Sequence, residues 1–442
     1  MSIFSEYLSN YVNGKSVCIL GFGREGRSTY KKIEQYCSPA SVSIADLNPI
    51  DRASAGLPDS VSIITGKEYQ SCLEDYDIVF KSPGIVLDKH PAQLKCEVTS
   101  ETQIIFTVYR RQIIGITGTK GKSTVTSLIY HVLRESGVDT RIAGNIGIPV
   151  FEIADGITDS TVIVCELSCH QLEYMTVSPS AAVFLNLYEE HLDHYGTMEN
   201  YYNAKKNIYL HQKNGDTLWC NSDIAPKGIS ADVITVSAAD STADVYVSNA
   251  VIRDSSRSEF PIPTDKIKLL GVHNHYNIAI AWDVCRRYVT GEQFRAALSS
   301  FDPLAHRLEY VDTVRGIRWY DDSISTACAT AIEAVKSVPD CGTILIGGMD
   351  RGIDYAPLVE FLSAASVNVI CMEASGKRVY DMLPKLQRIH CVPHLNEAVS
   401  LAAEITPAGK SCVLSPAAAS YGIFKNFEER GDAFKALVAG LK

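Results

Sequence analysis

The segment TGTKGKST at positions 117–124 has the residue types that hold a triphosphate. Gly118 and Gly121 free the backbone amides to face phosphate oxygens, and Lys122 reaches the terminal phosphates. The strict Walker pattern is not met, because position 116 is isoleucine, and a Gly/Lys turn without nucleotide stays as the alternative. The hydroxyl of Ser123 or Thr124 can ligate magnesium. The predicted phosphate-binding residues are Gly118, Thr119, Lys120, Gly121, Lys122, Ser123 and Thr124.

Two further candidate residues follow apolar segments that read as strands. Glu166 comes directly after 161–165, and His191 follows the segment that begins at 183. In a doubly wound parallel sheet, the carboxyl ends of the strands face the ligand crevice, so both side chains are expected near the phosphate loop. The spacing of His191 and His194 allows a zinc pair, but no third soft ligand is evident. An oxygen-rich magnesium site suits a phosphate loop better.

A third candidate site lies near the N-terminus, where Gly21, Gly23 and Gly26 form a G-x-G-x-x-G pattern after an apolar run. Asp46 lies about 20 residues past the last glycine, as in dinucleotide-binding folds. The pattern alone leaves three readings open: a dinucleotide, a nucleotide-sugar diphosphate, or a tight turn without ligand. Ser82, in the loop that follows 78–80, is expected at the same sheet edge.

The elements that must position these residues alternate between strand and helix, which predicts an α/β protein with parallel sheets. A polar, β-branched stretch at 220–265 reads as a small antiparallel excursion. At about 150 residues per domain, 442 residues predict three domains, and we place them at 1–100, 101–303 and 304–442. Strands are expected at 16–20, 42–45, 78–80, 112–116, 161–165, from 183, and at 343–346, 367–372 and 411–414; helices are expected from 27, at 125–133 and at 278–288.

Composition narrows the class of protein. The chain is 46% hydrophobic and 21% charged, which is ordinary for globular domains. With 41 Lys and Arg against 51 Asp and Glu, its net charge is −10, which argues against broad binding of nucleic acid or anionic membranes. We expect no signal peptide and no membrane span. Thirteen scattered cysteines without a C-x-x-C pair indicate reduced thiols in a cytoplasmic protein.

The motifs together resemble the Mur ligase family, in the right order from Gly21 to Gly431, and most closely its glutamate-adding branch. The segments GITGTKGKST (115–124) and AHRLE (305–309) are typical of the superfamily, and LSPAAASYGIFKNFEERG (414–431) is typical of that branch. The other matching segments are GNIG (144–147), ELSCHQLE (166–173), NLYEEHLDHYGTMENYYNAKKNIY (186–209), HNHYN (273–277), DDSIST (321–326) and GGMDRGID (347–354).

The resemblance implies a Rossmann-like N-terminal domain that binds the UDP moiety, a central P-loop ATPase domain with a mostly parallel sheet, and a C-terminal Rossmann-like domain that binds the amino acid. It implies an ATP-dependent ligase that joins D-glutamate to UDP-N-acetylmuramoyl-L-alanine through an acyl phosphate, in peptidoglycan precursor synthesis. ATP and Mg²⁺, with two metal sites, are the implied cofactors. A cytoplasmic monomer that binds the UDP-sugar and glutamate is expected.

The resemblance also assigns roles to single residues. It implies metal ligands at Ser123, Glu166 and His191, and a carbamylated lysine at Lys205 that acts with them. The catalytic set is Lys122, Glu166, His191 and Lys205. Nucleotide contacts outside the phosphate loop are implied at Asn274, Asn277, Arg307 and Asp322. Substrate contacts are implied at Arg24, Glu25, Asp46, Ser82, Asn145, Ser168 and Gln171, and glutamate contacts at Thr326, Arg351, Ser420 and Phe427.

The sequence departs from the family pattern in the amino-acid pocket and in the first domain. Ile324 stands where the family usually has lysine, and Arg351 replaces another lysine. In the first domain, Arg24 and Glu25 replace the usual apolar–Thr pair. Ligation of L-glutamate or of another amino acid is therefore the alternative within the family. Three other readings explain fewer of the motifs: an NAD-dependent dehydrogenase, a non-catalytic Mur-like subunit, and a folylpolyglutamate synthase.

Overall fold

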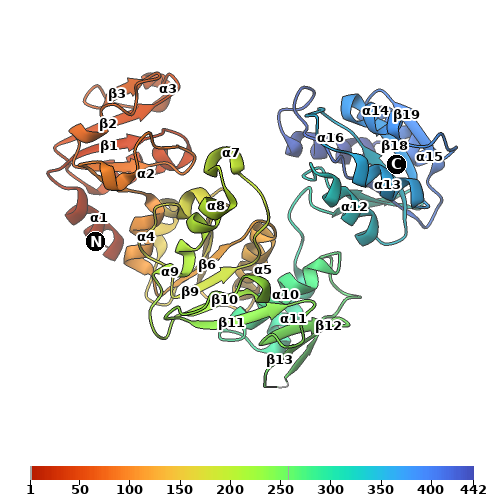
Figure 1. Ribbon diagram of the computed structural model, residues 1–442, viewed down its shortest axis with the longest axis horizontal. Helices are drawn as coiled ribbons and strands as arrows, with labels where there is room; N and C mark the ends of the chain where they lie inside the picture. Colours follow the sequence, from red (N-terminus) through yellow and green to blue (C-terminus); the bar gives the residue numbers. More distant parts are fainter. Residues whose placement is uncertain (1, 257) are drawn as a thin grey trace. The chain divides into compact units, whose positions relative to one another are not determined.

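The computed structural model describes residues 2–256 and 258–442, and it confirms an α/β protein built on three separate sheets (Figure 1). The described chain divides into two compact units. Unit 1 runs to Ile262 and includes Tyr276–Leu298, and unit 2 comprises Pro263–His275 and Ser299–Lys442. Unit 1 holds the first two sheets and unit 2 holds the third. The three domain boundaries expected from the sequence stay a prediction.

The first sheet is parallel throughout, because each strand returns through a crossover. Its central strands are fully buried apolar runs, as the sequence predicts, and Ser16–Leu20 forms β1 with the predicted bounds. A Cβ at Gly26 would lie 2.0 Å from the carbonyl oxygen of Gly21, so the turn after β1 requires this glycine. The order is β3 (Ser62–Thr65), β2 (Ser41–Asp46), β1 (Ser16–Leu20), β4 (Ile78–Lys81) and β5 (Glu97–Thr99).

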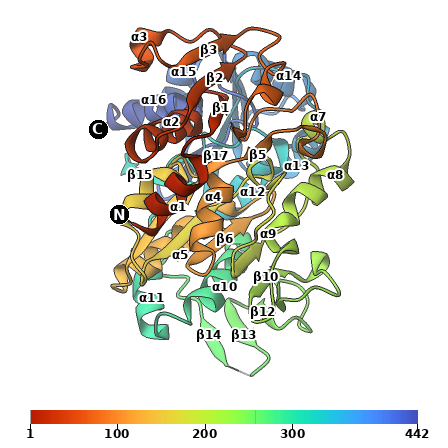
Figure 2. The same cartoon turned by 90° about the vertical axis from the view of Figure 1, so that its left-hand side faces the viewer.

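The middle sheet has nine strands, and it is parallel except at one edge. The antiparallel excursion predicted for 220–265 is confirmed only in its second half, where β12–β14 form a meander beside α10 and α11 (Figure 2). The first half is wrong, because β11 pairs in parallel with both of its neighbours. Phe260 of this meander stacks on Trp282 with ring centroids 4.6 Å apart. The order is β14 (Glu259–Pro261), β13 (Val251–Asp254), β12 (Val245–Ser248), β11 (Asp232–Ser237), β10 (Thr217–Asn221), β9 (Ala181–Phe184), β6 (Ile113–Thr117), β8 (Val162–Glu166) and β7 (Thr140–Gly144).

The third sheet is parallel apart from an antiparallel edge strand, β15, which the sequence analysis did not foresee. Polar and apolar residues are mixed along β15 and most of them are partly exposed, whereas the core of β17 is a continuous apolar run. Trp319 of β16 is fully buried here, and it is the tryptophan of unit 2. The order is β15 (Glu309–Val314), β16 (Ile317–Asp321), β20 (Ser411–Leu414), β17 (Cys341–Ile346), β18 (Asn368–Met372) and β19 (Ile389–Val392).

The helices cover these sheets, and three of them begin earlier than the sequence predicts. The helix expected from 27 begins at Arg24. The helix after β6 begins at Lys122, and the helix expected from 278 begins at His273. The helices are α1 (Ile3–Val12), α2 (Arg24–Tyr36), α3 (Arg52–Ala55), α4 (Glu101–Tyr109), α5 (Lys122–Glu135), α6 (Cys169–Leu172), α7 (Leu192–Tyr195), α8 (Met198–Lys205), α9 (Asn207–Leu210), α10 (His273–Cys285), α11 (Gly291–Ser300), α12 (Cys328–Ser337), α13 (Ala356–Ala364), α14 (Glu373–Met382), α15 (Leu395–Ile405) and α16 (Phe427–Ala439).

Candidate active site

The predicted phosphate loop connects β6 to α5, and β6 lies between β9 and β8 in the middle sheet. Gly118 and Gly121 have φ values of +156° and +84°. A Cβ at Gly118 would lie 2.9 Å from that of Leu185, and one at Gly121 would lie 3.0 Å from Oδ1 of Asn277. Both glycines are therefore needed for the turn. The first amides of α5 have no acceptor within the helix and point toward the loop, which favours an anion there.

Asn186, just after β9, holds this loop open. Its carbonyl oxygen accepts the amide of Thr119 at 3.0 Å, and its Oδ1 accepts the amide of Lys120 at 2.8 Å. Its Nδ2 donates to the carbonyl oxygen of Lys120 at 3.0 Å. The hydroxyl of Thr119 contacts that of Tyr201 at 3.1 Å. These bonds fix the conformation of the loop.

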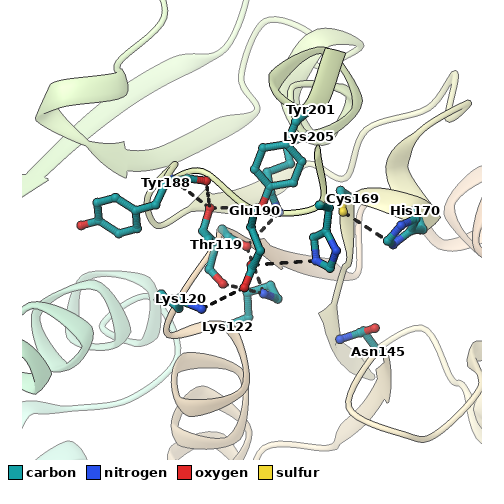
Figure 3. Close-up of polar contacts among 12 residues, drawn as sticks. Thr119, Lys120, Lys122, Asn145, Cys169, His170, Tyr188, Glu190, Tyr201 and Lys205 are labelled. Atoms are coloured by element: carbon teal, nitrogen blue, oxygen red, sulfur yellow. Dashed lines mark hydrogen bonds and ion pairs between the residues drawn. The ribbon is translucent and has the colours of Figure 1, made fainter. Parts of the chain in front are cut away.

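Two lysines converge on one carbonyl of the loop (Figure 3). Nζ of Lys122 donates to the carbonyl oxygens of Gly118 and Thr119 at 3.1 and 2.9 Å, and Nζ of Lys205 donates to that of Gly118 at 2.8 Å. Burial, reinforced by repulsion from Lys122, lowers the pKa of Lys205 to about 7. Burial also lowers the pKa of Lys122, although the carboxylates of Glu166 and Glu190 oppose that shift. The pair concentrates positive charge where a triphosphate would lie.

Glu166, at the end of β8, presents one carboxylate oxygen without a partner. Nδ2 of Asn145 donates to Oε1 at 2.7 Å, whereas Oε2 is buried and has no hydrogen-bond partner in the described part of the chain. A Cβ at Gly144 would lie 2.1 Å from the carbonyl oxygen of Glu166, so Gly144 lets the two strand ends meet. A buried, unsatisfied carboxylate oxygen is costly unless a cation or donor completes it. Mg²⁺ is a hard cation that prefers oxygen ligands, so the carboxylate of Glu166 is a suitable ligand for it.

His191 lies on the loop that leads into α7, with a left-handed backbone (φ +57°). Its Nε2 is 3.9 Å from Glu190, whose other oxygen binds Nζ of Lys120 at 2.9 Å (Figure 3). The rings of His170 and His191 are 5.1 Å apart, and Nε2 of His194 lies 3.4 Å from Glu173. His194 thus pairs with a carboxylate, whereas Glu190 links the predicted metal ligand His191 to the phosphate loop.

The predicted substrate residues of the first sheet meet the middle sheet within unit 1. Nη1 of Arg24 donates to the carbonyl oxygen of Gly147 at 3.0 Å, and Nε2 of Gln171 donates to Glu25 at 2.8 Å. Burial raises the pKa of Glu25. Ser168 caps α6, and its hydroxyl accepts the amide of Gln171 at 3.2 Å. A continuous polar strip therefore runs from the G-x-G-x-x-G turn toward Asn145.

Asp46 and Ser82 serve the turn that follows β1. Oδ2 of Asp46 accepts the amide of Phe22 at 2.8 Å, and Oδ1 accepts that of Asn48 at 2.8 Å. The hydroxyl of Ser82 donates to the carbonyl oxygen of Gly21 at 3.0 Å. The two residues lie at the carboxyl ends of β2 and β4, the strands on either side of β1, so they share one edge of the sheet as the sequence predicts. Both shape the turn from which a diphosphate would be held.

In unit 2, Asp322 follows β16 and is almost fully buried. Its carboxylate accepts the hydroxyl of Ser415 at 2.7 Å and the amide of Leu308, the neighbour of Arg307, at 3.2 Å. Burial raises the pKa of Asp322 to about 6. Nδ2 of Asn274 donates to the carbonyl oxygen of Leu270 at 2.6 Å. The predicted pair Arg307 and Asp322 is thus brought together through the backbone of Leu308.

The predicted glutamate-binding residues surround the carboxyl edge of the third sheet. The amide of Met349 donates to the carbonyl oxygen of Ala419 at 2.8 Å, which holds the loop of Arg351 beside that of Ser420. Arg351 is exposed, Ser420 is buried, and Thr326 is half-buried. The carbonyl oxygen of Phe427 accepts the hydroxyl of Ser323 at 2.9 Å, which ties α16 to the loop after β16.

The sequence analysis missed several residues that shape the site. Asn186, Glu190 and Tyr201 lie in the segment quoted for the family resemblance, but no role was given to them. The position of Asn186, as the first polar residue after an apolar strand, is the signal that would have singled it out. In unit 2, Arg430 is fully buried, and its guanidinium binds Ser323 and the carbonyl oxygen of Ala418.

Comparisons with known proteins agree with this geometry. The family model described as Mur ligase middle domain matches residues 116–285. The UDP-N-acetylmuramoylalanine–D-glutamate ligase of Symbiobacterium thermophilum is 32% identical over 403 residues, which is 86% of this chain and 88% of that protein. A protein of the same name from Ruminiclostridium cellulolyticum is 30% identical over 467 aligned positions and 99% of each chain.

Among solved structures, the fold resembles MurF ligase from Thermotoga maritima in complex with ADP, with a TM-score of 0.59 at 15% identity. The match covers 98% of this chain and 97% of that one, so the shared fold extends over the whole chain. Among the helices that the structure describes, none has the length and apolar character to cross a membrane.

Proposed function

This chain belongs to the Mur ligase family, and we propose that it joins D-glutamate to UDP-N-acetylmuramoyl-L-alanine, with ATP as the energy source, in peptidoglycan precursor synthesis. The observation that carries the proposal is similarity over almost the whole chain to proteins named for this reaction. The phosphate loop with its two converging lysines supports it. ATP and nucleotide-activated sugars are cytoplasmic metabolites, so we place the reaction in the cytoplasm. We also propose that the chain acts as a monomer.

The reaction needs a leaving group, because a carboxylate does not react with an amine. Transfer of the γ-phosphoryl group of ATP to the alanyl carboxylate forms an acyl phosphate and ADP. The neutral amine of glutamate then attacks the acyl carbon, and the tetrahedral intermediate collapses to the amide and phosphate. Lys122 neutralises charge on the transferred group, and the fixed loop amides hold the phosphates without reorganising.

Magnesium fits the residues present on this face of the middle sheet. Glu166 has its buried, unpartnered Oε2, and the hydroxyl of Ser123 and the ring of His191 complete the proposed set. Bound Mg²⁺ would neutralise phosphate charge and orient the triphosphate. Asn145 keeps the carboxylate of Glu166 in place by binding its other oxygen.

Carbamylation of Lys205 would resolve the unfavourable pairing of two buried ammonium groups. An amine reacts with carbon dioxide in its neutral form, and a pKa of about 7 makes the neutral form of Lys205 abundant at physiological pH. The product is a carbamate, so a cation beside Lys122 becomes an anion that can orient a metal. An ammonium group has no lone pair for a metal, which is why an unmodified Lys205 would be poorly placed there.

The contacts described above also suggest which residues bind the other parts of the substrates. We propose that Arg24, Glu25, Asp46 and Ser82 hold the UDP moiety, and that Asn145, Ser168 and Gln171 line the muramoyl group. Asn274 and Asn277 would contact the adenine side of ATP, and Arg307 with Asp322 would hold the nucleotide from unit 2. Thr326, Arg351, Ser420 and Phe427 would form the glutamate pocket.

A phosphate-release assay tests the function directly. The purified chain, supplied with ATP, Mg²⁺ and UDP-N-acetylmuramoyl-L-alanine, is expected to release phosphate with D-glutamate, slowly with L-glutamate, and not with alanine or lysine. Faster release with L-glutamate would show that Ile324, in place of the usual lysine, has altered the pocket. An absence of release with every amino acid would refute the ligase assignment.

Replacement of Arg351 by alanine is expected to raise the KM for glutamate about tenfold or more, and to change the KM for ATP much less. Its guanidinium offers a planar fork for one carboxylate of glutamate, and hydrogen bonds to charged groups contribute about 1.5–3 kcal/mol. Lys377→Ala, which removes an exposed cation from α14 of the same unit, is the matched control. Equal KM values for glutamate in the two variants would contradict the assignment of Arg351 to the glutamate pocket.

A further inference from the structure

The turn that carries Arg307 has an unusual backbone. His306 and Leu308, the residues directly before and after Arg307, have φ values of +62° and +44°. A left-handed conformation is uncommon for any residue except glycine, and for leucine it is an outlier that the surroundings must enforce. Such strain is found where a side chain has to be presented in one fixed direction. The residue between the two strained positions is the arginine proposed to hold ATP.

Four hydrogen bonds of the turn keep it in this conformation. The amide of His306 donates to Oε2 of Glu309 at 2.7 Å, and its carbonyl oxygen accepts the amide of Ile324 at 3.2 Å. The amides of Arg307 and Leu308 donate to the carbonyl oxygen of Leu304 and to Oδ1 of Asp322, both at 3.2 Å. His306 and Leu308 are therefore tied to the segment after β16, and Arg307 is held within the turn itself.

The ring of His306 locks the turn from the other side. Its Nδ1 lies 2.7 Å from Oδ2 of Asp321, and both side chains are buried. The ring sits directly on Gly431 of α16, where a Cβ would lie 2.1 Å from Nδ1 of His306 and 2.5 Å from Oδ2 of Asp321. Its edge faces the ring of Phe427, with centroids 6.1 Å apart. Only a glycine at position 431 leaves room for this arrangement.

The same side chains have the spacing of a cation site, since ligand atoms of His306, Glu309 and Asp321 lie within 4.8 Å of one another. Each of them already has a protein partner, however. The carboxylate of Glu309 binds Nζ of Lys435 at 2.8 Å and the amide of His306, and that of Asp321 binds the His306 ring and the amide of Ser323. The cluster is accordingly complete as a set of hydrogen bonds.

We propose that His306 is a positioning residue for ATP: its ring, held between Asp321 and Gly431, forces the strained turn that presents Arg307. The inference rests on the proposed function, since it concerns how Arg307 meets the nucleotide of that reaction. It assigns Gly431 a definite task, which is to leave the space that the ring occupies. The neighbouring side chain of Arg430 binds Ser323, so the first turn of α16 fixes both loops at once.

Gly431→Ala tests the proposal without replacing either His306 or Arg307. The added methyl group must displace the ring, so the KM for ATP is expected to rise about tenfold or more, the scale of one misplaced charge-assisted hydrogen bond. The KM for UDP-N-acetylmuramoyl-L-alanine should stay at the wild-type value. Gly440→Ala is the matched control, because it makes the same substitution at the other end of α16, where the Cβ would meet its nearest atom at 3.4 Å, an ordinary contact.

A second variant covers the case in which Gly431→Ala does not fold. His306→Asn keeps a residue that tolerates the left-handed conformation but removes the ring. It should raise the KM for ATP, and a lower melting temperature is expected as well, because the buried carboxylate of Asp321 loses its ring partner. In the background of Arg307→Ala, neither substitution should raise that KM further, because residues that act through one another are not additive.

The outcomes separate the two proposals. A smaller folded fraction lowers the apparent kcat but does not alter the KM for ATP. A lower kcat with an unchanged KM for ATP in both variants would therefore show a merely structural role and would overturn the positioning role of His306. An additive effect on Arg307→Ala would overturn it as well. Wild-type protein that releases no phosphate with any amino acid would instead refute the proposed function.

Discussion

Lys122→Ala is expected to lower kcat by about 10² or more, because we propose that its ammonium group neutralises charge on the phosphoryl group in transfer. In the structure its Nζ already lies within the loop, bound to the carbonyl oxygens of Gly118 and Thr119. Alanine leaves the loop amides and the Asn186 bonds in place, so nucleotide binding should weaken less than turnover falls. Single-turnover phosphate release at saturating ATP measures the effect on the chemical step.

Lys120→Ala serves as the comparison on the same loop. Lys120 is exposed and its Nζ pairs with Glu190, so its loss should reduce turnover much less than the loss of Lys122. Turnover of Lys122→Ala close to the wild-type value would contradict the assignment of this loop to ATP. The melting temperature of each variant shows whether the loop itself has been disturbed.

Lys205→Ala should be almost inactive, with kcat reduced by about 10² or more, and a short carboxylate such as acetate should restore part of the activity. The expected rescue follows from the proposed carbamate, whose negative charge a small carboxylate can replace in the space that the deleted side chain leaves. An unmodified lysine would not be replaced by an anion. Phosphate release measured with increasing acetate provides the test.

Lys206→Ala is the matched control, since the neighbouring lysine is half-buried and plays no part in the proposed site. It should keep the wild-type rate and show no response to acetate. NMR of the wild-type protein with ¹³C-labelled bicarbonate should show one carbamate signal, absent in Lys205→Ala. Full activity of Lys205→Ala would contradict the catalytic role, and rescue by ammonium-bearing amines instead of acetate would contradict the carbamate.

Much of the fold could be predicted because buried parallel strands leave a plain mark on the sequence. Ser16–Leu20 and Ser411–Leu414 are continuous apolar runs, and both form strands with the predicted bounds. The edge strand Glu309–Val314 was missed because polar and apolar residues are mixed along it, without a continuous apolar run. A continuous apolar run is therefore what made a strand recognisable. Burial alone was not enough, because Thr217–Asn221 and Ile317–Asp321 are largely buried and were also missed.

The site could be predicted only in part, for a different physical reason. Gly118 and Lys122 are recognisable because the phosphate loop is local, and a few adjacent residues determine its geometry. The bonds of Asn186 to this loop, and the seat of the His306 ring on Gly431, join residues far apart in the sequence. Such contacts depend on how the strands are ordered and on the directions of side chains, which residue types and spacing do not specify.

The distribution of the three tryptophans has an optical consequence. Trp219 and Trp282 belong to unit 1, and the indole of Trp319 is the one in unit 2, fully buried within 6.1 Å of the Phe434 ring. A chain in which Trp219 and Trp282 are replaced by phenylalanine would emit from Trp319 alone. Its red shift in denaturant would then follow the unfolding of unit 2 separately, and would reveal whether the two units melt together or in sequence.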